Sequence, residues 1–550
     1  MERLPEIDSV WPAQNRRYFL SSVATALAGS RLAGSAQASV NGQGEQRSMQ
    51  SFQTRLEAAR LQRKTIVPSH PDNGDETTYS NRIANFSKGL PHDVFGEVDP
   101  RAYDLLRAAL ESGDPADFER IPLGCPDSSL QRKLVNPMAG LAFDLEGADS
   151  HQLAIPPAPR FNSAEQGAEM VELYWQALLR DIPFEDYGYN SLASQAASDL
   201  SKMESFRGPK TDGRVTPQTL FRGSTPGDLQ GPYVSQFLCR PVPYGAQSVD
   251  QRIRPYKTGL NHITQFQEWL EIQNGFTPGA SVQFDDSFRY IRSGRDIARW
   301  VHVDLPFQAY LNASLILASP PEAGGMGAPL GPLNPYNTSS TQSGFGTFGV
   351  PHISTMVAEV ATRALKAVWF QKWFVHRRLR PEAFGGCVHQ RAAGLRSYSI
   401  HPQVLNSPTL QYVFSGNGSY LLPQAFPEGS PLHPSYGAGH ATVAGACVTI
   451  LKAFFDETFV VPNPVVPAPD GLTLTPYAGN DLTVGGELNK LAANIAIGRN
   501  FAGIHWRSDY KESLRLGEAV AISVLQDQLL TYREPCGFSL TRFDGSKVTI

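Results

Sequence analysis

The chain has 550 residues, with 48 lysines and arginines against 52 aspartates and glutamates, and a formal net charge of −4 at pH 7. This balance gives no general attraction to nucleic acid or to an anionic membrane surface, so neither partner is predicted. The length allows a large core with more than one subdomain, and the 41% hydrophobic fraction is ordinary for a soluble protein.

The N-terminus resembles a twin-arginine export signal. Arg16 and Arg17 stand in NRRYFL, and the short apolar run SSVATALAG leads to the small-residue motif AQAS. We expect a signal peptide over residues 1–38 and an exported, periplasmic or extracellular protein. The alternative is a flexible amphipathic tail, because Arg31 interrupts the apolar run. No other stretch reaches the roughly 20 apolar residues of a membrane span.

Composition divides the remaining chain into four parts. Residues 39–80 are polar and rich in Ser, Gln and Gly, which predicts an extended arm or linker. Runs such as PRAYDLLRAALES predict an N-terminal helical region over residues 81–290. Residues 291–535 carry the candidate site, and residues 536–550 form a C-terminal tail. With no internal repeat and no sustained strand pattern, the predicted fold class is mainly α.

Two segments rich in Pro and Gly interrupt the last helical region. Residues 319–349 are too polar for a core and precede the first site helix, so we expect a long loop that walls the pocket. Residues 462–479, PNPVVPAPDGLTLTPYAG, read as a second extended loop.

The cysteines suggest no metal site. They are odd in number and widely spaced: Cys125, Cys239, Cys387, Cys447 and Cys536. Cys447 lies in an apolar helical run and is predicted to be a buried free thiol. One or two disulfides could form after export, and the spacing defines no pairing.

The first chemical cluster is KWFVHRRLRP, which contains Lys372 and Arg380. Apolar residues at helical spacing precede it, and Pro381 is predicted to end that helix near Arg380. The two cations are eight residues apart, a little over two turns, so they would share a helix face. Taken alone, the cluster fits a solvated basic end that complements the helix dipole better than it fits a site.

The second cluster is HPSYGAGH, a loop that leads into the apolar helical run ATVAGACVTILKAFF. Gly437 and Gly439 allow a tight turn and a close approach of the backbone to a ligand. The N–H groups at the start of the helix would face an anion, and His440 would lie in that first turn. A lone histidine here would more often be a cap or a core residue.

The third cluster is GRNFAGIHWRSD. Arg499 precedes His505 by six residues, and Asp509 follows His505 by four, which makes the last two neighbours on a helix. A carboxylate on one imidazole nitrogen fixes the tautomer and leaves the other nitrogen free as a nucleophile or ligand. The flanking Ile504 and Trp506 favour burial over a surface ion pair.

Together the three clusters predict a pocket for a tetrahedral oxyanion, with several cations, backbone N–H groups and one histidine beside the central atom. In this order they resemble the signature of the type-2 phosphatidic acid phosphatase superfamily, which includes the vanadium-dependent haloperoxidases. Trp369, His433 and the GIHWRSD string are similar to the bromoperoxidase branch. The resemblance is close over about residues 295–528 and implies helical bundles around one core.

The resemblance also implies the roles of individual residues. The cofactor would be vanadate, and His505 would bond its vanadium. Gly439 would donate a backbone N–H, His440 would be the acid–base residue, and Trp369 and His433 would line the halide side. The cations that hold the vanadate oxygens would be Lys372, Arg380 and Arg499. An acidic partner for one of the arginines is expected, and Asp304 is the candidate.

This family membership would make the chain an enzyme that oxidises halide, bromide before chloride, with hydrogen peroxide and so halogenates a small organic substrate. A homo-oligomer, most simply a dimer, is expected. Two departures stand out: Ala438 replaces the usual serine, a hydroxyl donor, and Gly498 replaces the serine usual in the phosphatases. The alternatives are an acid phosphatase with His505 as nucleophile, or a homologue that binds vanadate or phosphate without oxidising halide.

Overall fold

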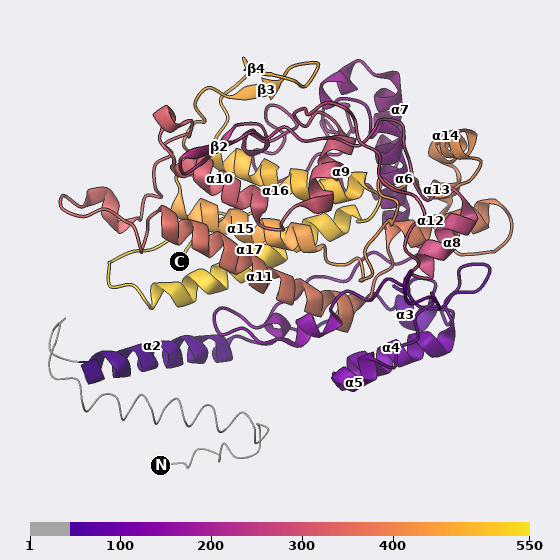
Figure 1. The fold of residues 1–550 in the computed structure, drawn as a ribbon, viewed down its shortest axis with the longest axis horizontal. Coiled ribbons are helices and arrows are strands. Elements are labelled where there is room, and N and C mark those ends of the chain that lie inside the picture. The colour runs from indigo at the N-terminus through magenta and orange to yellow at the C-terminus, as the bar shows by residue number, and fades with distance from the viewer. Residues whose placement is uncertain (1–43) are drawn as a thin grey trace, which may run out of the picture. The chain divides into compact units, whose positions relative to one another are not determined.

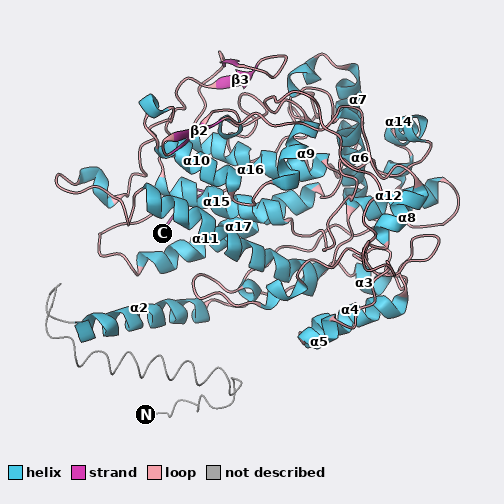
Figure 2. Ribbon diagram, in the orientation of Figure 1, coloured by secondary structure: helices cyan, strands magenta, loops and turns pink. Residues whose placement is uncertain are grey.

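Helices dominate the residues that the computed structural model describes, which are 44–550 (Figure 2). The mainly α prediction is therefore confirmed. The predicted signal peptide, residues 1–38, lies outside the described residues, and export stays a prediction. None of the helices within residues 44–550 is both long and apolar enough to cross a membrane.

The helices, in chain order, are α2 (Gly44–Lys64), α3 (Asp75–Thr78), α4 (Pro100–Ser112), α5 (Pro115–Phe118), α6 (Ala164–Leu179), α7 (Ser191–Ser201), α8 (Phe266–Gln273), α9 (Gly294–Val303), α10 (Gln308–Ala318), α11 (Val350–Phe370), α12 (Pro381–Ala392), α13 (Pro402–Leu405), α14 (Pro408–Asn417), α15 (Gly439–Phe454), α16 (Val484–Phe501) and α17 (Arg507–Leu529). Short 3₁₀ turns join several of them, including η2 (Pro137–Leu141).

The strands form three antiparallel hairpins: β1 (Val242–Tyr244) with β2 (Gln247–Val249), β3 (Val465–Pro467) with β4 (Leu474–Pro476), and β5 (Ser539–Thr541) with β6 (Lys547–Thr549). The second hairpin occupies part of the predicted loop 462–479, and the third lies in the predicted C-terminal tail.

The chain divides into two compact units, one ending at Glu57 and one spanning Ala58–Ile550. The described part of the first unit lies within α2. This helix occupies part of the segment predicted to be an extended arm, because GEQRSMQSFQTRLEAARLQRK is rich in good helix formers and lacks proline.

The core of the second unit is built around α15. This helix packs against α11, α16 and α17, and the four lie side by side in Figure 1. His440 is its one residue that is not buried. A helix that is apolar on all sides belongs in the interior, so the sequence of α15 explains its central place. Its first turn, which carries His440, reaches the partly exposed edge of this core.

Glycines allow α15 and α17 to touch backbone to backbone. A β-carbon on Gly445 would come 2.1 Å from the Leu514 carbonyl oxygen, and one on Gly517 would come 2.0 Å from the Thr442 carbonyl oxygen. This contact fixes α17 against α15. Because α17 begins two residues after His505 and α15 begins one residue before His440, it also fixes the spacing of the two histidines.

The helix that carries the first cluster does not continue to Arg380, so that prediction was wrong. α11 ends at Phe370, and a π-helical turn follows at Gln371–His376. Arg377 then adopts a positive φ of 41°, and Pro381 begins α12 with Arg380 as its N-cap. Proline suits the first turn of a helix as well as the position after one, and the sequence pattern alone does not separate these roles.

The loop at residues 319–349 does not wall the pocket, contrary to the prediction. Its Gly331 N–H donates to the Phe454 carbonyl oxygen over 2.8 Å, and Leu330 pairs with Phe455. Both contacts lie at the C-terminal end of α15, roughly 20 Å along the helix from His440. All five cysteines are free, and Cys447 is buried in α15 as predicted.

We expect Gly517→Ala to lower the free energy of unfolding by about 3 kcal/mol, because its methyl group overlaps the Thr442 carbonyl. Urea unfolding followed by circular dichroism measures this. Gly416→Ala in α14 is the control, since a methyl group there meets nothing within 4 Å. The control should be neutral or stabilise by up to about 1 kcal/mol. Equal stability of the two variants would contradict the close contact.

Candidate active site

Three buried cations from different elements form the centre of the site. The Lys372 ammonium, in the π turn, donates to the carbonyl oxygens of Pro434 and Ser435 over 2.9 and 3.0 Å. Arg380 donates to the carbonyl oxygens of His433 and Ile504 over 3.0 and 2.8 Å. Arg499, in the last turn of α16, donates to the Val301 carbonyl oxygen over 2.7 Å.

None of these cations forms an ion pair with a carboxylate in the part of the chain that the structure describes. Burial, and then repulsion by Arg380, lowers the pKa of Lys372 well below its usual value. Burial also lowers the pKa of Arg380 to about 9 and that of Arg499 to about 10. The Arg499 Nε–H is buried with no hydrogen-bond partner among the described residues. An anion placed here would stabilise the charged form of all three cations and would accept a hydrogen bond from the Arg499 Nε–H.

His505 presents one nitrogen toward these cations. Its Nδ1 lies 2.8 Å from a carboxylate oxygen of Asp509, and Arg380 donates to its Nε2 over 2.9 Å. The carboxylate holds the proton on Nδ1, which leaves a lone pair on Nε2. Burial, with the charges of Arg380 and Lys372 next, lowers the pKa of His505 well below its usual value, so this imidazole is neutral.

The predicted contact between His505 and Asp509 is present, although His505 lies outside the helix. α17 begins at Arg507, and Asp509 lies in its first turn. Gly503 has a φ of 87° and lets the chain bend between Arg499 and His505. The contact between His505 and Asp509 therefore does not come from two positions one turn apart on the same helix. It forms because the segment before α17 folds back onto the first turn of that helix.

Behind Asp509 lies a buried network that the sequence did not indicate. Arg378 donates to Asp509 over 2.8 Å, to Glu169 over 3.0 Å and to Gln166 over 2.6 Å. Burial raises the pKa of Glu169 to about 7. Because Arg378 also binds Asp509, this carboxylate offsets the charges of Lys372 and Arg380 only in part. Arg378 lies in RRLRP with Arg380, and no pattern within that string separates the two.

His440 faces Asp304 across the pocket. Its Nε2 lies 2.9 Å from a carboxylate oxygen of Asp304, the C-cap residue of α9. Burial favours the protonated acid, but His440 and Arg499 outweigh it and lower the pKa of Asp304. Asp304 was predicted to pair with an arginine. Its hydrogen bond goes instead to His440, and Arg499 acts on it only through its charge.

The N-terminus of α15 reaches the same pocket. Ala438 is its N-cap and offers no side-chain cap, while its own N–H donates to the Ser513 hydroxyl over 2.8 Å. A β-carbon on Gly439 would stand 3.3 Å from the Trp369 indole, so glycine keeps this part of the backbone open. Backbone N–H groups at a helix start favour an anion.

His433 and Trp369 form an adjoining wall. Their rings lie 4.8 Å apart between centroids, and the Lys372 ammonium lies 5.7 Å from the indole centroid. Arg380 donates to His433 Nδ1 over 2.9 Å. Burial, with Lys372 and Arg380 next, lowers the pKa of His433 well below its usual value. The ring is therefore neutral. Its Nδ1 also lies 3.1 Å from the Pro434 carbonyl oxygen, which favours the opposite tautomer to the contact with Arg380.

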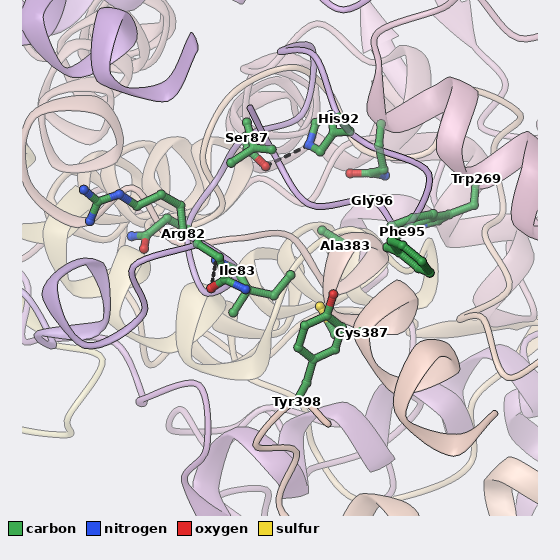
Figure 3. Close-up of a pocket in the computed structure, with 14 residues that line it drawn as sticks. Arg82, Ile83, Ser87, His92, Phe95, Gly96, Trp269, Ala383, Cys387 and Tyr398 are labelled. Carbon is green, nitrogen blue, oxygen red and sulfur yellow. Dashed lines mark hydrogen bonds between the residues drawn. The ribbon is translucent and has the colours of Figure 1, made fainter. Parts of the chain in front are cut away.

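A second, separate pocket is lined by none of the predicted site residues. Figure 3 shows it between the segment from Arg82 to Gly96, Trp269 and the α12 residues Ala383 and Cys387, and its volume is about 20 Å³. This space suits a single water molecule.

The donor set fits a tetrahedral oxyanion such as vanadate. It offers three cations, the start of α15 and one neutral imidazole nitrogen, and it needs no carboxylate ligand. Within residues 44–550 there is no cluster of three His, Cys, Asp or Glu that would hold a metal cation instead. Lys372, Arg380, Arg499, Gly439 and His505 are the residues that would hold the oxyanion.

This chain is similar in sequence and in structure to known proteins. A family model described as the VCPO second helical-bundle domain matches residues 417–532. A vanadium-dependent bromoperoxidase from Corallina officinalis is 39% identical over 92% of this chain and 99% of its own. Another from Ascophyllum nodosum is 36% identical over 92% of both. The homohexameric second vanadate-dependent bromoperoxidase (AnII) of Ascophyllum nodosum superposes with a TM-score of 0.86 at 32% identity, covering 92% of this chain and 90% of that one.

We expect Asp509→Asn to weaken vanadate binding by roughly 10- to 100-fold, as for other outer partners of a ligating histidine. The amide can donate to Nδ1 and so move the imidazole proton to Nε2. Equilibrium dialysis of vanadate measures the loss. Glu512→Gln is the control, since Glu512 pairs with Arg515 on the same helix. Unchanged affinity in Asp509→Asn would contradict the role of this carboxylate.

Proposed function

Because the chain belongs to the vanadium-dependent bromoperoxidase family, we propose that it binds vanadate and oxidises bromide with hydrogen peroxide, which halogenates small organic substrates. The observation that carries this proposal is the convergence of three carboxylate-free cations on the lone pair of His505. A bromide-oxidation assay after vanadate loading, run beside a phosphate-ester hydrolysis assay, tests it. Ester hydrolysis with no bromide oxidation would favour the phosphatase alternative.

The chemistry that vanadate supplies when bound is the activation of hydrogen peroxide for oxygen transfer to halide. His505 would hold the vanadium through Nε2, with its tautomer fixed by Asp509. Lys372, Arg380 and Arg499 would hold the oxygens and withdraw negative charge from them, in a site that is built before the reaction starts.

Two further histidines have separate tasks in this proposal. Asp304 accepts from His440 Nε2, so Nδ1 is the nitrogen that would take a proton from hydrogen peroxide. His433 is neutral and lies beside Trp369, so the one N–H of its ring would donate to halide there. A neutral donor binds halide without adding another buried charge to the pocket.

We also propose that the chain forms a homo-oligomer. The supporting fact is that the related Ascophyllum nodosum bromoperoxidase (AnII) is a homohexamer. A dimer is the simplest closed assembly and was the expectation from the sequence. Light scattering of the purified protein gives the number of copies.

His505→Ala should abolish vanadate retention and bromide oxidation, because it removes the nitrogen that Arg380 and Asp509 orient. The measurements are vanadium content after gel filtration and the initial rate of bromide oxidation. His151→Ala, which alters a surface pair with Asp149, is the control and should keep both. Stoichiometric vanadium with normal bromide oxidation in His505→Ala would contradict the assignment of His505 as the vanadium ligand.

Ala438→Ser should raise vanadate affinity or bromide turnover by up to roughly tenfold, equal to one restored hydrogen bond of about 1.4 kcal/mol. Chloride, the harder halide to oxidise, should gain most. Steady-state rates with both halides after identical vanadate loading measure this. Ala438→Gly is the control, since it improves the helix N-cap without adding a hydroxyl. If the natural enzyme binds vanadate fully but oxidises neither halide, the chain is instead the homologue that binds vanadate without oxidising halide.

A further inference from the structure

An apolar groove lies directly beside the candidate active site. It runs between η2 and the outward face of α11 and has a volume of about 520 Å³, which suits a small organic ligand. Its apolar walls are Met138, Ala139, Ala142, Leu365 and Trp369. Leu365 and Trp369 are one turn apart on α11, so both project into the groove from the same helix face.

The groove and the active site share a wall. Trp369 lines the groove on one side, and its ring lies 4.8 Å from that of His433. A β-carbon on Gly439 would lie 3.3 Å from Trp369 and 3.7 Å from Leu365. The segment at the end of the groove is also tied to the site, because Val135 N–H donates to the carbonyl oxygen of Leu432, next to His433. A ligand in the groove is therefore one side chain away from the proposed halide position.

The groove carries no unpaired charge. Its single ionic lining group, Lys366, pairs with Asp144 over 2.8 Å. The Trp369 indole N–H donates to the Val135 carbonyl oxygen over 3.1 Å. Among the described residues, the Asn136 side-chain amide has no hydrogen-bond partner. Apolar walls with one free amide fit a neutral, mostly apolar molecule with one hydrogen-bonding group.

We propose that this groove binds the organic acceptor of the halogenation, a neutral alkyl-substituted phenol or a molecule of that class. The inference rests on the proposed function. Bromide loses two electrons to hydrogen peroxide as the O–O bond breaks. One oxygen goes to bromine and forms hypobromous acid, and the other takes up a proton and leaves as water. The ring carbon then forms a bond to bromine and loses its proton, which leaves with the hydroxyl of hypobromous acid as water. A groove beside the source of this oxidant raises the local concentration of acceptor where the oxidant appears.

A competition experiment tests the proposal with the vanadate-loaded full chain. A hydrophobic para-alkylphenol and a compact, water-soluble 1,3-dione are offered together, and the ratio of their brominated products is measured. The same mixture treated with reagent hypobromous acid gives the ratio for an oxidant that diffuses freely. We expect the enzyme to favour the alkylphenol by roughly five- to tenfold over the reagent, from burial of its apolar surface.

Ala142→Trp fills the groove from an exposed position and should return the ratio to that of the reagent. Ala393→Trp places the same side chain at the exposed C-cap of α12 and should keep the natural ratio. In both variants, tribromide formation without any organic acceptor should match the natural enzyme, because neither position belongs to the proposed oxyanion site.

The possible failures are distinct. Absence of tribromide formation in the natural enzyme would contradict the proposed function itself. Normal tribromide formation with a product ratio equal to that of the reagent would overturn the groove assignment alone. A changed oligomer mass in Ala142→Trp with an unchanged product ratio would overturn it too, since the groove would then be an interface between copies.

Discussion

Repulsion among three buried cations is the constraint on which the rest of this structure depends. Lys372, Arg380 and Arg499 are held by backbone carbonyl oxygens, and the nearby carboxylates are engaged elsewhere. Carbonyl oxygens hold a cation in place without cancelling its charge, so the pocket stays positive. Such a site has a built-in preference for an anion of high charge and tetrahedral shape, and vanadate and phosphate share both properties.

The surrounding fold keeps the nearby carboxylates out of direct ion pairs with these cations. Asp509 is shared between His505 and Arg378, and Asp304 is bonded to His440. Both carboxylates thus orient a histidine, and they offset the charge of the pocket cations only from a distance. The glycine contact between α15 and α17 brings the two histidines to one place, so packing far from the pocket decides where the proposed acid–base group and the proposed vanadium ligand stand.

The sequence predicted the members of the site better than their geometry. Cation and histidine identities at ordered spacings indicated Lys372, Arg380, Arg499, His440 and His505, because oxyanion chemistry restricts which side chains serve. The route of the chain between Lys372 and Arg380 could not be predicted, since Pro381 is equally suited to follow or to begin a helix. Glu169 and Gln166 reach the site from residues far away in sequence, where no local pattern links them to Arg378.

The π turn at Gln371–His376 has a consequence for how this chain tolerates changes of length. A π turn holds one more residue than an α-helical turn, so losing a residue there would let the segment close as α-helix and rotate Lys372 away by about 100°. Insertions and deletions in this segment should therefore be far rarer among functional relatives than substitutions. The loop 319–349 meets the opposite end of α15, and its length is free to vary without moving the pocket.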